Sequence, residues 1–112
     1  YIKGPKFLDF VMSDEFNKTN KKELYNFVKE LIRQCLLLDG IGLRHTQLQV
    51  GKNILVTKRK GKIFPVIIDF EKASIDYKKK KEKNFGQITS FLFYNPNGAV
   101  AKKIRKKLNI RL

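Results

Sequence analysis

Two side chains that carry ligand oxygens stand at the ends of two short apolar segments. Asn53 opens the segment 53–57, Asn-Ile-Leu-Val-Thr, and Asp69 lies near the end of the segment 64–70, Phe-Pro-Val-Ile-Ile-Asp-Phe. Both segments are rich in β-branched and aromatic residues, and the basic stretch 58–62 separates them, which predicts an exposed hairpin. A hairpin places the start of its first strand beside the end of its second. We therefore expect the carboxamide and the carboxylate to converge at one edge of the hairpin.

The same residues also have purely structural interpretations. The chain has one histidine, His45, and a lone histidine is more often a hydrogen-bonded structural residue than a general base. Asn53 and Asp69 are residue types that commonly form turns, and either could simply end a strand. Whether they do chemistry therefore depends on the elements around them.

A long helix is expected directly before His45. Apolar residues recur at helical spacing over 21–38, Asn20 and Glu23 have the spacing of a capping box, and Gly40 follows as a stop signal. Further helices are expected within 6–16, from a cap at Asn84 onwards, and at the end of the chain, where Val100, Ile104 and Leu108 lie four residues apart. The sequence thus predicts one α+β domain over 1–112, mostly α with one small antiparallel hairpin.

The order of these motifs resembles the C-terminal lobe of the protein kinase superfamily. His45, Leu48 and the run 53–56 follow the order of a kinase catalytic loop and its strand, and Ile68-Asp69-Phe70 is similar to the Asp-Phe-Gly element. The segment 1–5, Tyr-Ile-Lys-Gly-Pro, looks like the hinge between kinase lobes. The short connection after Asp69 is similar to that of atypical Rio-like and archaeal-type Ser/Thr kinases. This resemblance implies that the N-terminal kinase lobe lies outside these 112 residues.

The resemblance also implies cofactors and roles. ATP and Mg²⁺ would be bound, with Asp69 and Asn53 as metal ligands, and a protein substrate would be phosphorylated on Ser or Thr. The position of the catalytic base falls on Gln47, which is not a carboxylate, and His45 would be structural. Asn84 would replace the Asp that ties down the catalytic loop. Since no Asp or Glu lies between residues 40 and 68, we expect degenerate catalysis, and little activity from these residues without the N-terminal lobe.

Charge and cysteine content limit the remaining classes of protein. The chain has 25 Lys and Arg against 10 Asp and Glu, a net charge of +15, which favours a polyanionic partner. The single Cys35 excludes an internal disulfide and indicates a reducing, cytoplasmic compartment, and no apolar run is long enough for a membrane span. The alternative to a kinase lobe is therefore a soluble, non-catalytic basic module that binds RNA, a ribosomal partner or another polyanion.

Overall fold

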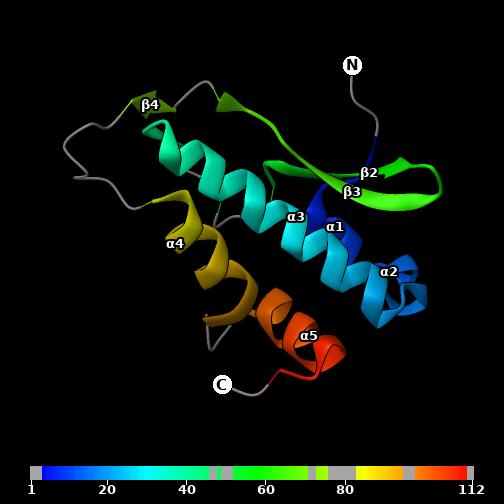
Figure 1. The fold of residues 1–112 in the computed structure, drawn as a ribbon. Helices are drawn as coiled ribbons and strands as arrows, with labels where there is room; N and C mark the ends of the chain where they lie inside the picture. The colour runs from blue at the N-terminus through cyan, green and yellow to red at the C-terminus, as the bar shows by residue number, and fades with distance from the viewer. Residues whose placement is uncertain are drawn as a thin grey trace.

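Helix α3, Lys21–Gly40, forms the centre of the molecule (Figure 1). The computed structural model describes residues 4–45, 48, 52–70, 73–75, 83–94 and 98–110. The helix begins where the sequence predicts, because the Asn20 side chain accepts a hydrogen bond from the Glu23 N–H at 2.8 Å. It ends two residues later than predicted. The chain reverses direction at Gly42, with φ of 77°, so Gly40 completes the last turn instead of stopping it.

The segment before α3 forms two short helices where one was predicted. Helix α1 covers Phe7–Val11 and helix α2 covers Asp14–Lys18. Ser13 separates them, since its hydroxyl and its backbone N–H both donate to the Phe10 carbonyl, at 2.6 and 3.0 Å. A serine that satisfies a carbonyl in this way competes with continuation of the helix.

The predicted hairpin is present, but its strands have different bounds. Strand β2 is Ile54–Arg59 and strand β3 is Lys62–Ile67, paired antiparallel. The basic stretch 58–62 is therefore mostly strand, and only Lys60 and Gly61 form the turn. Their φ angles of 53° and 78° are those of a two-residue turn whose twist matches the flanking strands.

Strand β3 ends at Ile67, earlier than the predicted residue 70. Asp69 has a left-handed φ of 63°, which an extended strand cannot accommodate, so the chain leaves the ladder there. A second antiparallel pair, absent from the prediction, joins two short strands that precede and follow the hairpin. The remaining elements are β1 (Leu43–Arg44), β4 (Ser74–Ile75), α4 (Asn84–Thr89), the π-helix η3 (Ser90–Tyr94) and α5 (Ala99–Leu108).

The elements form layers on either side of α3. The β2–β3 hairpin lies on one side, and α4, η3 and α5 lie on the other (Figure 1). A continuous apolar core joins them, and it includes the stacked rings of Phe7 and Phe27, 5.2 Å apart. The fold is thus α+β and mostly helical, as predicted. None of the helices in the described ranges is long and apolar enough to cross a membrane.

Candidate functional site

His45 is a buried structural residue, as the sequence predicts. Its side chain is 2% exposed, and its Nε2 atom lies 2.9 Å from the Ile68 carbonyl oxygen. A carbonyl can only accept, so Nε2 carries the proton and donates. The ring also packs edge-on against Phe70, with centroids 5.2 Å apart. His45 therefore links the loop after β1 to the segment that carries Asp69.

Two amide side chains from α4 hold the loop that contains His45. Asn84 accepts from the His45 N–H and donates to the Leu43 carbonyl, both at 2.7 Å. Gln87 donates to the His45 carbonyl at 2.6 Å and accepts from the Leu48 N–H at 3.3 Å. Buried backbone groups need such partners, and here one helix supplies four of them. Asn84 thus ties down the loop as expected, while the contribution of Gln87 was not foreseen.

The cap of α4 differs from the prediction. Asn84 is the first residue of the helix and its side chain points back to the loop, so it does not cap. Instead, the carboxylate of Asp39 at the end of α3 accepts from the N–H groups of Asn84 and Phe85, at 2.7 and 3.0 Å. It also pairs with Arg44 at 3.2 Å, in a bridge whose two side chains are 2% and 9% exposed. One sequence signal could have revealed this residue, because a carboxylate is disfavoured in the last turn of its own helix.

Asn53 lies against the residue before Asp69 at the open end of the hairpin. The Ile68 N–H donates to the Asn53 carbonyl at 2.8 Å, which places the residue before Asp69 directly against Asn53. Asp69 is exposed, and no hydrogen bond or ion pair to the described residues engages its carboxylate. Its φ of 63° is left-handed, a conformation that Asp adopts more readily than most residues with a side chain.

The metal-binding potential of this edge is that of one carboxylate and one carboxamide. Within the described ranges, no three His, Cys, Asp or Glu side chains are grouped so that they could hold a metal ion. Gln47, the predicted base position, lies outside the described residues, as do residues 1–3 of the predicted hinge. The rest of that segment packs on β2, where the Val56 N–H donates to the Pro5 carbonyl at 2.8 Å.

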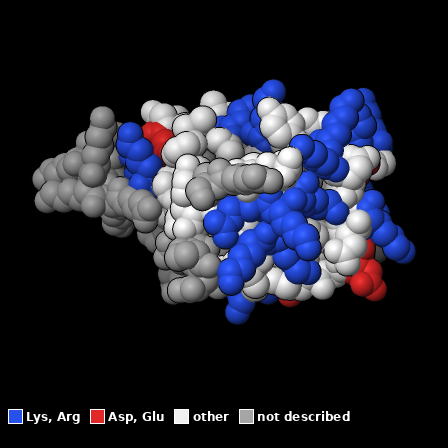
Figure 2. Space-filling view, turned by 90° about the horizontal axis from the view of Figure 1, so that it is seen from below, with Lys and Arg blue, Asp and Glu red and all other residues white. Residues whose placement is uncertain are grey.

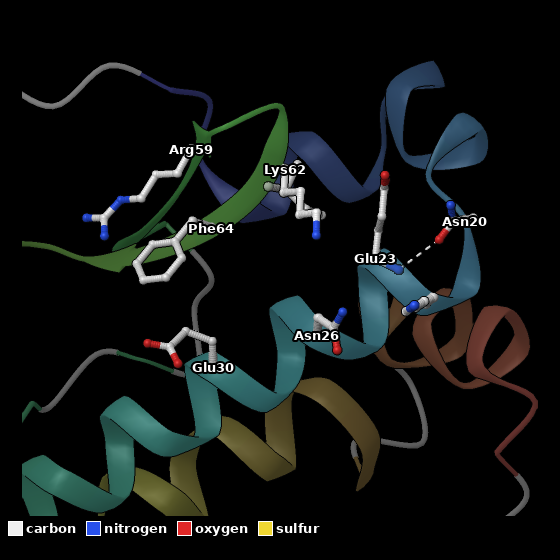
Figure 3. A pocket seen from close by; sticks show the side chains of 9 residues that line it. Asn20, Glu23, Asn26, Glu30, Arg59, Lys62 and Phe64 are labelled. Carbon is white, nitrogen blue, oxygen red and sulfur yellow. Dashed lines mark hydrogen bonds between the residues drawn. The ribbon is translucent and has the colours of Figure 1, made fainter.

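A polar groove of 440 Å³ lies elsewhere, between the first half of α3 and the hairpin. Figure 3 shows Glu23, Asn26 and Glu30 from the helix facing Arg59 and Phe64 from the strands. The carboxylate of Glu30 already binds Arg33 at 2.6 and 2.7 Å, and this bond lowers the pKa of Glu30. None of the predicted site residues lines the groove.

The geometry thus defines a small helical α+β protein in which a buried network holds one loop against the end of a hairpin. No known family model matches the chain. The chain is 35% identical over 107 residues to the uncharacterized protein MJ1211 of Methanocaldococcus jannaschii, and this similarity covers 92% of the chain and 84% of that protein. The chain belongs to the same family as MJ1211.

Proposed function

We propose that this protein is the C-terminal lobe of an atypical, Rio-like Ser/Thr protein kinase that binds ATP with Mg²⁺ at Asn53 and Asp69. The proposal combines the order of the sequence motifs with the way their residues are held. It concerns nucleotide and metal binding first and phosphoryl transfer second.

The observation that carries the proposal is the double anchoring of Ile68. Its N–H donates to the Asn53 carbonyl at 2.8 Å and its carbonyl accepts from His45 Nε2 at 2.9 Å. Asp69 follows immediately and is exposed, so its carboxylate faces solvent next to a residue whose N–H and carbonyl are both hydrogen-bonded. A buried histidine that anchors the residue before an exposed carboxylate favours a binding site over a simple turn.

The donor set suits Mg²⁺ that arrives with a nucleotide. Mg²⁺ takes oxygen ligands and is commonly bound by one or two carboxylates together with substrate phosphates and water. Asp69 would supply the carboxylate and Asn53 the amide oxygen, and a bound Mg²⁺ would neutralise phosphate charge. A single carboxylate is too little for a bare ion, so we expect metal and nucleotide to bind together.

The absence of a base carboxylate sets the expected level of catalysis. No Asp or Glu occurs between residues 40 and 68, so the chain supplies no acidic group from its loop to accept the proton of a substrate hydroxyl. General-base assistance contributes about 10²- to 10⁴-fold in rate. We therefore expect weak phosphoryl transfer, with nucleotide binding as the better preserved property.

The test is calorimetric titration of ATP, with and without Mg²⁺, into the full-length gene product and its Asp69→Asn variant. Asparagine tolerates the left-handed backbone but lacks the charge, so the fold should survive. Metal-dependent affinity should fall at least about tenfold, because even losing an outer-shell partner of a metal ligand costs about 10- to 100-fold.

The matched control is Asp14→Asn, which removes the same charge from an exposed position on α2. It should leave nucleotide affinity unchanged. The proposal fails if the wild-type protein shows no Mg²⁺-dependent nucleotide binding. It also fails if Asp69→Asn lowers the melting temperature by several degrees while affinity stays the same, because Asp69 would then be a structural turn residue.

A further inference from the structure

Helix α5 carries a dense group of cations, which we call the basic face. Half of its ten residues are Lys or Arg, and it contains no acidic residue. Figure 2 shows blue side chains gathered over the side of the molecule where α5 lies, with acidic side chains only at its edges. The basic face consists of Lys102, Lys103, Arg105, Lys106 and Lys107.

The apolar side of α5 is buried in the core. Val100, Ala101, Ile104 and Leu108 are all buried, and the helix packs on η3, α3 and α1. Its cations are therefore presented by a helix that is fixed in place. The helix also has no apolar stripe left to insert into a lipid surface, as interfacial membrane helices do.

Two of the cations are held by the ends of the first two helices. The Lys103 ammonium donates to the Val11 carbonyl at 3.3 Å, and the Lys107 ammonium donates to the carbonyls of Phe16 and Asn17. Lys107 also lies 4.7 Å from the centroid of the Phe16 ring. Carbonyls at helix C-termini attract cations, so these side chains are ordered before any ligand arrives. A hollow of 370 Å³ lies beside them, and Lys106 contributes to its lining.

The charge of the basic face is not neutralised within the described part of the chain. The ion pairs found there are Arg33–Glu30, Arg44–Asp39 and Lys58–Glu15, and none involves α5. Five cations on ten residues of helix would repel one another without an external anion. The net charge of +15 adds to the same field.

We propose that the basic face binds the phosphodiester backbone of a nucleic acid. The ten residues of α5 span about 15 Å, and a duplex carries one charge per about 1.7 Å of its axis, so about nine phosphate charges lie within its length. A polymer of regularly spaced anions matches a row of cations without apolar anchors. The hairpin that carries Asn53 and Asp69 lies on the other side of α3 (Figure 1), so this surface is separate from the proposed nucleotide site.

The test compares two double variants that remove the same charge. Lys102→Gln with Lys106→Gln changes two exposed positions of the basic face, and glutamine is a good helix former. Lys58→Gln with Lys62→Gln changes two exposed positions of the hairpin. Binding of labelled RNA and DNA duplexes of one sequence is followed by fluorescence anisotropy from about 0.05 to 0.2 M salt, and circular dichroism checks that both variants are folded.

We expect the α5 variant to reduce the slope of log affinity against log salt by about 1.8, since each lost phosphate contact removes about 0.9. If the affinity extrapolated to 1 M salt is unchanged, binding at about 0.1 M weakens about 60-fold. The hairpin variant should bind nearly as the wild type does. The RNA and DNA arms show which backbone is preferred, and tight binding of either one by this face supports the proposal.

Three results would overturn the proposal. The duplexes could fail to bind in low salt, or the two double variants could lose affinity equally, which would indicate attraction to net charge without a defined face. Vesicles of phosphatidylserine and phosphatidylcholine could bind as tightly as duplex at equal phosphate and lose binding in the same variant, which would indicate a membrane surface. Loss of Mg²⁺-dependent nucleotide binding would not affect this proposal, because the two sites share no residue.

Discussion

Replacing Asp39 by asparagine should cause a large loss of stability for a single change of charge. The carboxylate joins three parts of the chain, because it caps α4 through two backbone N–H groups and pairs with Arg44 at 3.2 Å. Arg44 is 2% exposed, and its Nε atom has no hydrogen-bond partner among the described residues. Asp39 therefore supplies the negative charge that makes burial of this guanidinium tolerable.

The magnitude follows from what the substitution leaves behind. Asparagine keeps one carbonyl oxygen, so one of the two capping bonds is lost at a cost of about 1 kcal/mol. The larger loss comes from Arg44, because removing one partner of a buried pair typically costs about 3–5 kcal/mol. The sum, about 4–6 kcal/mol, is a large share of the roughly 5–15 kcal/mol that stabilises a domain of this kind.

Urea unfolding followed by circular dichroism measures this loss. Adding Arg44→Met to Asp39→Asn should restore part of the stability, because the unpaired buried charge is then removed. Glu30→Gln is the control, since it breaks a pair with the exposed Arg33 and should leave the midpoint unchanged. The reasoning is refuted if Asp39→Asn lowers the free energy of unfolding by less than about 1 kcal/mol. It is also refuted if the loss in the double variant equals the sum of the losses in the two single variants.

Two further predictions concern Cys35 and Gly4. Burial, helped by the negative charge of Asp39, raises the pKa of the Cys35 thiol from 9.0 to about 12. Between these values the thiol ionises in the unfolded chain but stays protonated in the folded protein. The free energy of unfolding is therefore unaffected by this group below pH 9.0 and falls by about 1.4 kcal/mol per pH unit from pH 9.0 towards pH 12. When urea denaturation is measured on either side of pH 9.0, the free energy of unfolding should fall less steeply with pH for Cys35→Ala than for the wild type. An equally steep fall in both proteins would contradict the raised pKa of Cys35. Gly4→Ala would place a methyl group against the Val56 carbonyl, so it should lower stability by about 1–3 kcal/mol, and an unchanged melting temperature would show that the segment yields freely.

Much of the fold could be predicted because local signals agree with the packing. The Asn20 cap and the apolar period of α3, and the four-residue spacing of Val100, Ile104 and Leu108 in α5, are properties of short stretches of chain. The hairpin was predicted for the same reason, although its strands begin and end elsewhere. The predicted end of the second strand, residue 70, was wrong because contacts from His45 in the loop after β1 determine the backbone around Asp69. No local sequence pattern contains such contacts.

The candidate site shows the same limit. The sequence predicted the tie formed by Asn84 and a hydrogen-bonded His45, and both residues make such bonds. The backbone bond from Ile68 to Asn53 follows from hairpin geometry, while the convergence of the Asn53 and Asp69 side chains stays a prediction. The roles of Asp39 and Gln87 were missed, since each binds groups about forty residues away in sequence. The β1–β4 pair was missed as well, because two-residue strands have no periodicity to detect.

The anchoring of the His45 loop by α4 has a consequence for the order of folding. The four bonds from Asn84 and Gln87 join residues that are 39 to 42 positions apart in the sequence. Forming them therefore closes a long loop of chain, which carries an entropic cost. The hairpin and α3 can form from near neighbours, whereas His45 and Leu48 gain their bonds to Asn84 and Gln87 only once α4 has docked. Amide hydrogen exchange at His45 and Leu48 should therefore occur through undocking of α4, at a lower free energy than exchange within α3. Any ligand that needs an ordered loop would in turn favour the docked helix.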